Sequence, residues 1–309
     1  MILVTGGLGM IGAQTARALT DLGHTVVATA HRRTERPSFL PDDVIVEQLD
    51  VTDAAAVSTL GDRYRITDIV HLAGSIPGED RVAYFRADTA GLLTMLDAAR
   101  SWRVRRFAVA GSLGSYLGSS AITWHEDLPL PAVAVPHPII AFKKAVEPLT
   151  TNALRDTGIQ ALVLRIGSTW GPLMDPATPF NAVPPYISSV LRGERPTALH
   201  AHDGGDFCYA PDAGRAIALL ITADALGHEI YNISSGQPFT NGQLIDAVRA
   251  AIPDARLDVL DVLDGRSGGP GRDPYLDISR LTTDTGFEPA FDLTAAVADY
   301  ISWRAHHAR

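Results

Sequence analysis

The sequence predicts an α/β fold in which a doubly wound parallel sheet is followed by a smaller C-terminal α/β lobe. In the first half of the chain, short runs rich in β-branched residues alternate with longer helical patterns, which is typical of parallel βαβ units. After Pro172 the pattern changes to a proline-rich passage and then to a second mixture of helices and strands. A chain of 309 residues has enough apolar material to form a core in both parts.

The individual elements follow from these patterns in order. Strands are expected at residues 2–4, 25–29, 44–48, 69–72, 107–110 and 161–165, and helices at residues 11–22, 54–63, 89–101 and 142–157. We expect a nucleotide-binding domain at residues 1–171, to which residues 206–232 return. Residues 172–205 and 233–309 are then expected to form the substrate-binding lobe.

Composition excludes several classes of function. The net charge of −9 and a pI near 5.5 argue against a general nucleic-acid binder or a protein that binds anionic membranes. Cys208 is the only cysteine, so the chain can form neither an intramolecular disulfide nor a cysteine-based metal site, and no metal is predicted. No apolar run is long enough to span a membrane, and no signal peptide is visible. We therefore expect a cytoplasmic location.

A glycine-rich turn marks the expected nucleotide site. Gly6, Gly9 and Gly12 follow the first strand with the spacing G-x-x-G-x-x-G, and a helix is expected directly after them. This spacing lets backbone N–H groups, including those of Met10 and Ile11, and the helix N-terminus approach a pyrophosphate. A structural glycine turn is the alternative, but the position between a strand and a helix favours a Rossmann-type cofactor site.

From these residues onward, the chain resembles the extended short-chain dehydrogenases/reductases, which include nucleotide-sugar epimerases and dehydratases. Its opening TGGLGMIG resembles theirs, Asp50-Val51-Thr52-Asp53 resembles their adenine-contacting D-x-x-D, and the similarity continues in order to YNISSG at residues 231–236. His71-Leu72-Ala73-Gly74 resembles their H-L-A-A, whereas Asp88 replaces the usual asparagine of N-V-x-G. The resemblance implies a dinucleotide cofactor. It would be contacted by Asp50, Val51, Leu72, Ala73 and Gly74.

The end of the second strand favours NADPH over NADH. Members specific for NAD carry an acidic residue there, which holds a ribose hydroxyl and repels a 2′-phosphate. This chain has Ala30 at that position, followed by His31, Arg32 and Arg33, and a guanidinium suits a phosphate. The alternative is that these residues form a solvated basic loop.

The catalytic residues of the family are only partly present. Family members use a serine and a Tyr-x-x-x-Lys pair, in which the tyrosine exchanges the proton and the lysine binds the nicotinamide ribose. By resemblance, Ser112 is the serine and Lys143 the lysine, but Ile139 stands where the tyrosine belongs. Using Lys144 as the lysine only replaces Ile139 by Ile140. Because Lys143 and Lys144 are the only lysines of an arginine-rich chain, we expect Lys143 to be kept for function.

Losing the tyrosine favours carbonyl reduction. Alcohol oxidation needs a base, which isoleucine cannot provide, whereas hydride addition to a ketone creates a basic alkoxide that water or a substrate hydroxyl can protonate. We therefore expect an NADPH-dependent ketoreductase in which Ser112, or a water that it holds, stabilises the oxyanion. The substrate contacts are predicted to come from Ser112, Tyr116, Ile139, Trp170, Met174 and Phe207. This set suits a bulky, hydrophobic and aromatic ketone. The alternative for Tyr116, Trp170, Met174 and Phe207 is that they pack in the core.

A finer resemblance supports the same interpretation. Atypical family members without the tyrosine, one of them from the simocyclinone pathway, reduce aromatic polyketides in actinomycetes, and Ile139 makes this chain similar to them. Two alternatives stay open: a non-catalytic NADPH-binding sensor, and a nucleotide-sugar epimerase or dehydratase with a retained NAD. The expected partner is a small-molecule ketone. A homodimer through the helices at residues 89–101 and 142–157 is consistent with the family, and the sequence does not decide between dimer and monomer.

Overall fold

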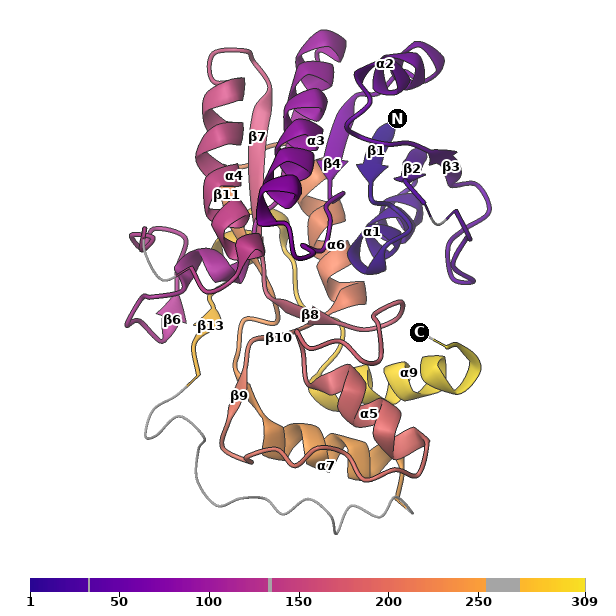
Figure 1. The fold of residues 1–309 in the computed structure, drawn as a ribbon, viewed down its shortest axis with the longest axis vertical. Coiled ribbons are helices and arrows are strands. Elements are labelled where there is room, and N and C mark those ends of the chain that lie inside the picture. Colours follow the sequence, from indigo (N-terminus) through magenta and orange to yellow (C-terminus); the bar gives the residue numbers. More distant parts are fainter. Residues whose placement is uncertain (33, 133–134, 254–272, 309) are drawn as a thin grey trace.

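The computed structural model describes residues 1–32, 34–132, 135–253 and 273–308. Its centre is a parallel sheet in the order β11-β7-β5-β4-β1-β2-β3 (Figure 1). The strands are β1 (Ile2–Thr5), β2 (Val26–Ala30), β3 (Ile45–Gln48), β4 (Asp68–His71), β5 (Arg106–Ala110), β7 (Gln160–Ile166) and β11 (Ile230–Ile233). β1, β2 and β4 are buried along their whole length, as strands of a sheet covered on both faces must be. The predicted doubly wound fold is thereby confirmed.

Helices cover both faces of this sheet. One face packs against α1 (Met10–Asp21), α6 (Ala210–Thr222) and α8 (Ser279–Thr285), and the other against α2 (Ala54–Arg63), α3 (Arg81–Trp102) and α4 (Pro138–Leu154). α3 begins at Arg81 rather than at residue 89, because the Asp80 side chain accepts hydrogen bonds from the backbone N–H groups of Val82 and Ala83 and so caps an earlier start. No helix in the described part of the chain is long and apolar enough to cross a membrane.

The strand order reverses between β1 and β4. Such a switch point opens a crevice at the carboxyl ends of the strands, because the connections on either side leave in opposite directions. The loops that follow β1, β2 and β4 therefore meet at one edge of the sheet. In Figure 1 this edge faces the rest of the molecule.

The smaller lobe lies beyond the carboxyl ends of the strands (Figure 1). Its helices are α5 (Val183–Leu191), α7 (Asn241–Ala251) and α9 (Leu293–His306), and its short paired strands are β8 (Ser168–Trp170) with β10 (Phe207–Tyr209) and β9 (Gly204–Gly205) with β12 (Phe239–Thr240). A further pair joins β6 (Thr123–Trp124) to β13 (Tyr275–Leu276). Leu281 and Phe287, from the segment that the sequence assigned to the lobe, pack in the core of the first domain.

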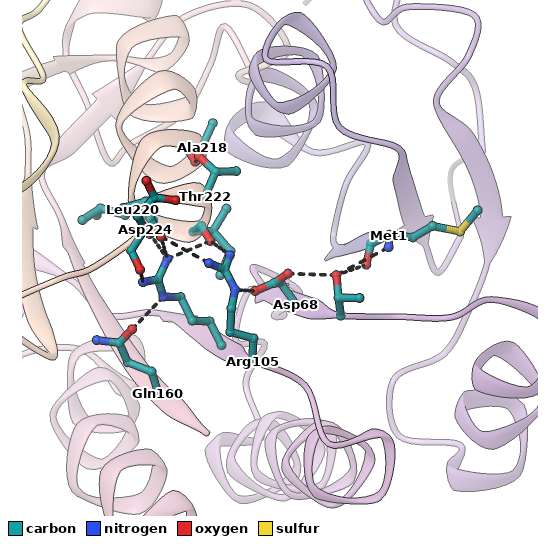
Figure 2. Close-up of polar contacts among 12 residues, drawn as sticks. Met1, Asp68, Arg105, Gln160, Ala218, Leu220, Thr222 and Asp224 are labelled. Carbon is teal, nitrogen blue, oxygen red and sulfur yellow. Dashed lines mark hydrogen bonds and ion pairs between the residues drawn. The ribbon is translucent and has the colours of Figure 1, made fainter. Parts of the chain in front are cut away.

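Arg105 and its neighbour Arg106 anchor the C-terminal end of α6 at the amino ends of the strands, opposite the crevice. Figure 2 shows Arg105 with its partner Asp68. Arg105 donates to Asp68 Oδ1 at 2.9 Å and to the Ile221 carbonyl at 2.6 Å. Arg106 is 3% exposed, and its guanidinium donates to the carbonyls of Ile221 and Ala223. These bonds satisfy the last carbonyls of α6 and place positive charge at the negative end of its dipole.

Candidate active site

The glycine loop after β1 is shaped by two close approaches. Gly6 has a φ of +66°, and a Cβ on it would lie 2.9 Å from the backbone nitrogen of Ala73. A Cβ on Gly12 would lie 2.2 Å from the Gly6 carbonyl oxygen, so the first turn of α1 can approach the loop only if residue 12 is glycine. Gly9 is the N-cap of α1. The N-terminus of α1 is consequently held at the carboxyl edge of the sheet, where it can bind a phosphate.

A cleft of about 490 Å³ opens beside this loop. Of the residues that the sequence predicted to bind the cofactor, it is lined by Gly6, Gly9, His31, Arg32, Asp50, Val51, Leu72, Ala73 and Gly74. Met10, Ile11 and Gly12 form the first turn of α1 instead and do not line the cleft. Arg33 lies outside the described residues, as does Arg272, which is a further candidate anion ligand.

At one end of the cleft a histidine lies beside a carboxylate. His31 Nε2 lies 3.5 Å from Asp50 Oδ2. The backbone N–H of Thr52 and its hydroxyl both donate to Asp50 Oδ1, at 2.9 and 2.8 Å, and these bonds hold the pKa of the Asp50 carboxyl below its usual range. Glu35 also lines the cleft, which sequence reasoning missed. No acidic residue stands at the end of β2 itself, because residue 30 is alanine.

Asp88 holds the loop that follows β4. Its Oδ1 accepts hydrogen bonds from the Ser75 backbone N–H at 3.1 Å and from the Ser75 hydroxyl at 2.6 Å. The carboxylate lines the same cleft. Burial raises the pKa of the Tyr84 hydroxyl, and the nearby Asp88 carboxylate raises it further. Asp88 therefore places a carboxylate at the position where the family that this chain resembles has a neutral asparagine.

Lys143 rather than Lys144 points to the end of β5. Lys143 Nζ donates to the carbonyl of Ala110, the last residue of β5, at 2.6 Å. Lys144 Nζ donates instead to Leu117 and Pro131, so it ties down a surface loop. Burial lowers the pKa of Lys143 to about 8, and the Asp88 carboxylate opposes this shift in part. The residue one turn before Lys143, on the same face of α4, is Ile139.

An aliphatic side chain, that of Ile140, packs near Ser112. The Ser112 hydroxyl accepts a hydrogen bond from the Gly114 backbone N–H at 3.0 Å. A Cβ on Gly114 would lie 3.0 Å from Ile140 Cγ1 and 3.3 Å from Ser112 Oγ, so Ile140 packs close to the serine. No tyrosine hydroxyl in the described part of the chain forms a hydrogen bond with Ser112 or Lys143.

Comparison with known proteins decides the family. Residues 2–234 match the NAD dependent epimerase/dehydratase family. The chain belongs to this family. It is 26% identical to a dTDP-glucose 4,6-dehydratase of Actinoplanes sp. over 98% of this chain and 97% of the relative, and 24% identical to a UDP-glucose 4-epimerase of Azospirillum brasilense over 98% and 91%. Its fold is that of UDP-glucose 4-epimerase from Thermotoga maritima, with a TM-score of 0.82, 21% identity and 98% of each chain covered.

Membership in this NAD-dependent epimerase/dehydratase family identifies the chain as an enzyme of the extended short-chain dehydrogenase/reductase type that uses a nicotinamide cofactor. The residues present fit such a cofactor. Gly6 and Gly12 leave room that a Cβ would fill, and the N-terminus of α1 reaches the cleft edge, where a pyrophosphate can bind.

Three residues expected in the substrate pocket of this family member lie in hydrophobic core clusters. Tyr116 is fully buried, and its hydroxyl donates to Asn232 Oδ1 and accepts from Arg165, both at 2.8 Å. Trp170 is also fully buried, and together with Phe207 it borders a cavity of only about 10 Å³. A cavity of this size holds at most one water. The structure therefore places Tyr116, Trp170 and Phe207 in the core, and Met174 is half-buried; that any of them contacts substrate stays a prediction.

An aromatic pair lies near the start of α4: Phe180, an aromatic residue that the sequence offered for the lobe, and His137, which sequence reasoning missed. Phe180 is 54% exposed, and its ring centroid lies 5.9 Å from that of His137. His137 is the N-cap of α4, and its Nδ1 accepts from the backbone N–H of Ile139 at 3.3 Å. The pair thus lies next to the residue that replaces the tyrosine. A histidine directly before Pro138 was the available sequence feature, because proline favours the first position of a helix.

Proposed function

We propose that this family member is an NADPH-dependent ketoreductase that acts on a bulky, aromatic carbonyl compound. The observation that carries the proposal is Ile139, which stands one turn before Lys143 where a proton-exchanging tyrosine belongs. An alcohol cannot be oxidised readily without a base beside its hydroxyl, and isoleucine is not one. Hydride addition to a ketone produces an alkoxide, which is basic enough to take its proton from water or a substrate hydroxyl. Reduction therefore depends less on an acidic side chain of the protein.

The chain supplies groups for each part of the cofactor. The N-terminus of α1 with Gly6 and Gly9 suits the pyrophosphate, and His31 with Arg32 suits a 2′-phosphate. The Lys143 ammonium has three donors, of which one goes to Ala110, so the others are available to ribose hydroxyls. When bound, NADPH supplies the hydride for the carbonyl carbon.

Ser112 is the group of the chain that can stabilise the developing oxyanion. Its oxygen accepts from Gly114, so its own hydrogen is free to be donated to the reacting oxygen. The proton that completes the alcohol then comes from water or from a hydroxyl of the substrate. A phenol that is hydrogen-bonded to the ketone would polarise it and supply this proton. The exposed Phe180 beside His137 supports an aromatic substrate, because aromatic rings pack favourably on one another.

The test compares two aromatic ketones that differ at one group: a hydroxyl next to the carbonyl, and its methyl ether. With NADPH, we expect the hydroxyl compound to be reduced at least ~10-fold faster, because only it carries a proton to donate. Ser112→Ala should lower kcat by roughly 10²- to 10³-fold, the usual loss for one oxyanion donor. Full turnover by Ser112→Ala would show that the serine has no such role.

A second candidate, a nucleotide-sugar epimerase or dehydratase, is favoured by the names of the relatives. It requires that the protein retain NAD through purification and convert a nucleotide sugar such as dTDP-glucose or UDP-glucose. Both are measured directly, by release of the cofactor on denaturation and by chromatography of the sugar nucleotide. Conversion at an enzymatic rate would replace the ketoreductase proposal.

A further inference from the structure

The connection between β2 and β3 has two parts with different surroundings. His31, Arg32 and Glu35 line the cofactor cleft. Residues 36–44, named here the β2–β3 loop, fold back on themselves instead. The Arg36 guanidinium donates to the carbonyls of Pro41 and Val44 at 2.6 and 2.7 Å, which closes this loop into a compact unit. Because Glu35 directly precedes this loop in the chain, movement of the loop would displace the residues that line the cleft.

The end of α9 contacts this loop. The ring of Phe39 meets that of Trp303 edge-on, with centroids 5.4 Å apart, and Trp303 in turn stacks on His307 at 3.5 Å. Ser38 Oγ lies 3.0 Å from His307 Nε2. In Figure 1 the loop between β2 and β3 approaches the C-terminal end of α9, although the two are far apart in sequence. We call Ser38, Phe39, Trp303 and His307 the latch.

The hydrogen bonds of the latch fix the tautomer of His307. Its Nδ1 lies 2.9 Å from the Trp303 carbonyl oxygen, which can only accept, so Nδ1 carries the hydrogen. Nε2 of the neutral ring is then an acceptor for the Ser38 hydroxyl. Each polar atom of the ring is thereby used, and the ring plane is held against Trp303.

A cavity makes the latch important for the position of Phe39. About 440 Å³ of space lies between α1, α6, α9 and the loop, lined among others by Gln14, Arg17 and Phe39. Phe39 therefore borders open space on the side of α1, and its ring contact is with Trp303. Leu40, which directly follows Phe39, and Val44 pack in the core and anchor the second half of the loop, so the latch acts on the residues before Leu40, toward the cleft.

We propose that the latch is a positioning device for the cofactor: α9 holds the β2–β3 loop so that His31 and Arg32 present the right surface to the adenosine end of the dinucleotide. This inference rests on the dinucleotide site of the proposed function but not on the ketone. When the latch is open, only a fraction of the molecules has a binding-competent loop. The apparent Kd then rises by the inverse of that fraction.

The experiment compares two adjacent histidines. His307→Ala removes the ring that bonds Ser38 and stacks on Trp303, whereas His306→Ala changes a residue of the same helix end that lines the same cavity and contacts the Ser302 carbonyl. Titration calorimetry of the full chain with NADPH should give a Kd roughly 10-fold higher for His307→Ala. It should change less than about 2-fold for His306→Ala. Phe39→Ala removes the ring that the loop contributes to the latch and should raise the Kd for NADPH to a similar extent.

A second readout separates positioning from general damage. Backbone amide exchange of residues 34–44 should be faster in His307→Ala than in wild type and His306→Ala, while kcat at saturating NADPH stays unchanged. If His307→Ala does not fold, Ser38→Ala, which removes only one hydrogen bond of the latch, replaces it in the same comparison. An unchanged Kd in Ser38→Ala and Phe39→Ala, with unchanged exchange, would overturn the latch. If wild type prefers NADH or reduces no ketone, the proposed function fails, but the same comparison with the dinucleotide that binds still decides the latch.

Discussion

Ile139 lies one turn before Lys143 on the same face of α4, and the Lys143 ammonium donates to the Ala110 carbonyl at 2.6 Å. We expect this lysine, at the end of β5, to be the lysine of the family pair, with an aliphatic side chain at the position expected for its tyrosine partner. Everything that distinguishes the proposed reaction from alcohol oxidation depends on this one replacement.

Ile139→Tyr should restore alcohol oxidation. A phenol one turn from Lys143 would have its pKa lowered by the ammonium and could take the hydroxyl proton. We expect oxidation of the product alcohol with NADP⁺ to be about 10²-fold faster than in Ile139→Phe, which adds the same ring without the hydroxyl. Steady-state rates in the oxidative direction measure this. Equal rates for the two variants would mean that residue 139 does not face the reacting oxygen.

Lys143 should make cofactor binding depend on pH near 8. Burial lowers its pKa to about 8, so the side chain is an ammonium below that pH and a neutral amine above it. Because the cofactor is an anion, its Kd should rise as the pH passes through 8. Lys143→Arg keeps the charge over this range and should lose the pH dependence while still binding, whereas Lys143→Met should bind weakly at every pH. Titrations between pH 6.5 and 9.5 test this, and an unchanged profile in Lys143→Arg would contradict it.

The cofactor cleft could be predicted from sequence because its determinants are local. Gly6 has a positive φ and a Cβ on Gly12 would meet the Gly6 carbonyl, so the turn itself calls for glycine at both positions, and Asp50 and Gly74 lie shortly after the ends of their strands. The strands were predicted to within a residue or two for the same reason, since buried parallel strands are continuous apolar runs.

Whether each aromatic residue lies in the core or lines a pocket could not be predicted, because its position depends on contacts between segments that are distant in sequence. Tyr116 is committed to Asn232 and Arg165, and Arg165 is itself held by Glu147 through a buried ion pair at 2.8 Å. Trp170 is covered by Tyr300 of α9, with ring centroids 5.7 Å apart. An aromatic residue near the end of a strand has the same local pattern whether it lines a pocket or fills a core.

Ala30→Asp should weaken the preference for NADPH. A carboxylate at the end of β2 would repel a 2′-phosphate and could accept hydrogen bonds from the ribose hydroxyls of NADH. We expect the ratio of kcat/KM for NADPH to that for NADH to fall by roughly 10- to 100-fold, with little change in Ala30→Asn, which has the same shape without the charge. The preference for NADPH in the wild type would itself be wrong if both dinucleotides bound equally well before any substitution.

Arg106→Met should destabilise the fold without touching the cleft. Besides the α6 carbonyls, Arg106 Nε donates to Gln160 Oε1 at 2.6 Å, so its guanidinium joins β5 to β7 and to the end of α6. Burial lowers the pKa of Arg106, yet its hydrogen bonds to main-chain oxygens compensate the desolvated charge. Methionine fills a similar length but donates nothing. Gln160 Oε1 then loses its donor, and the carbonyls of Ile221 and Ala223 keep only their bonds from Arg105. Each lost hydrogen bond from a charged donor costs ~1.5–3 kcal/mol.

The expected loss in the free energy of unfolding is therefore about 2–4 kcal/mol in urea denaturation. Arg100→Met, an exposed residue in the last turn of α3, is the matched control and should lose less than about 1 kcal/mol, because helix-dipole interactions at the surface are weak. Because Arg106 is the first residue of β5, it lies at the amino ends of the strands, away from the cleft at their carboxyl ends, and the Kd for the cofactor should be unchanged in the folded variant. If Arg106→Met were no less stable than Arg100→Met, the bonds from Arg105 would suffice to hold the end of α6, and the anchoring role of Arg106 would be wrong.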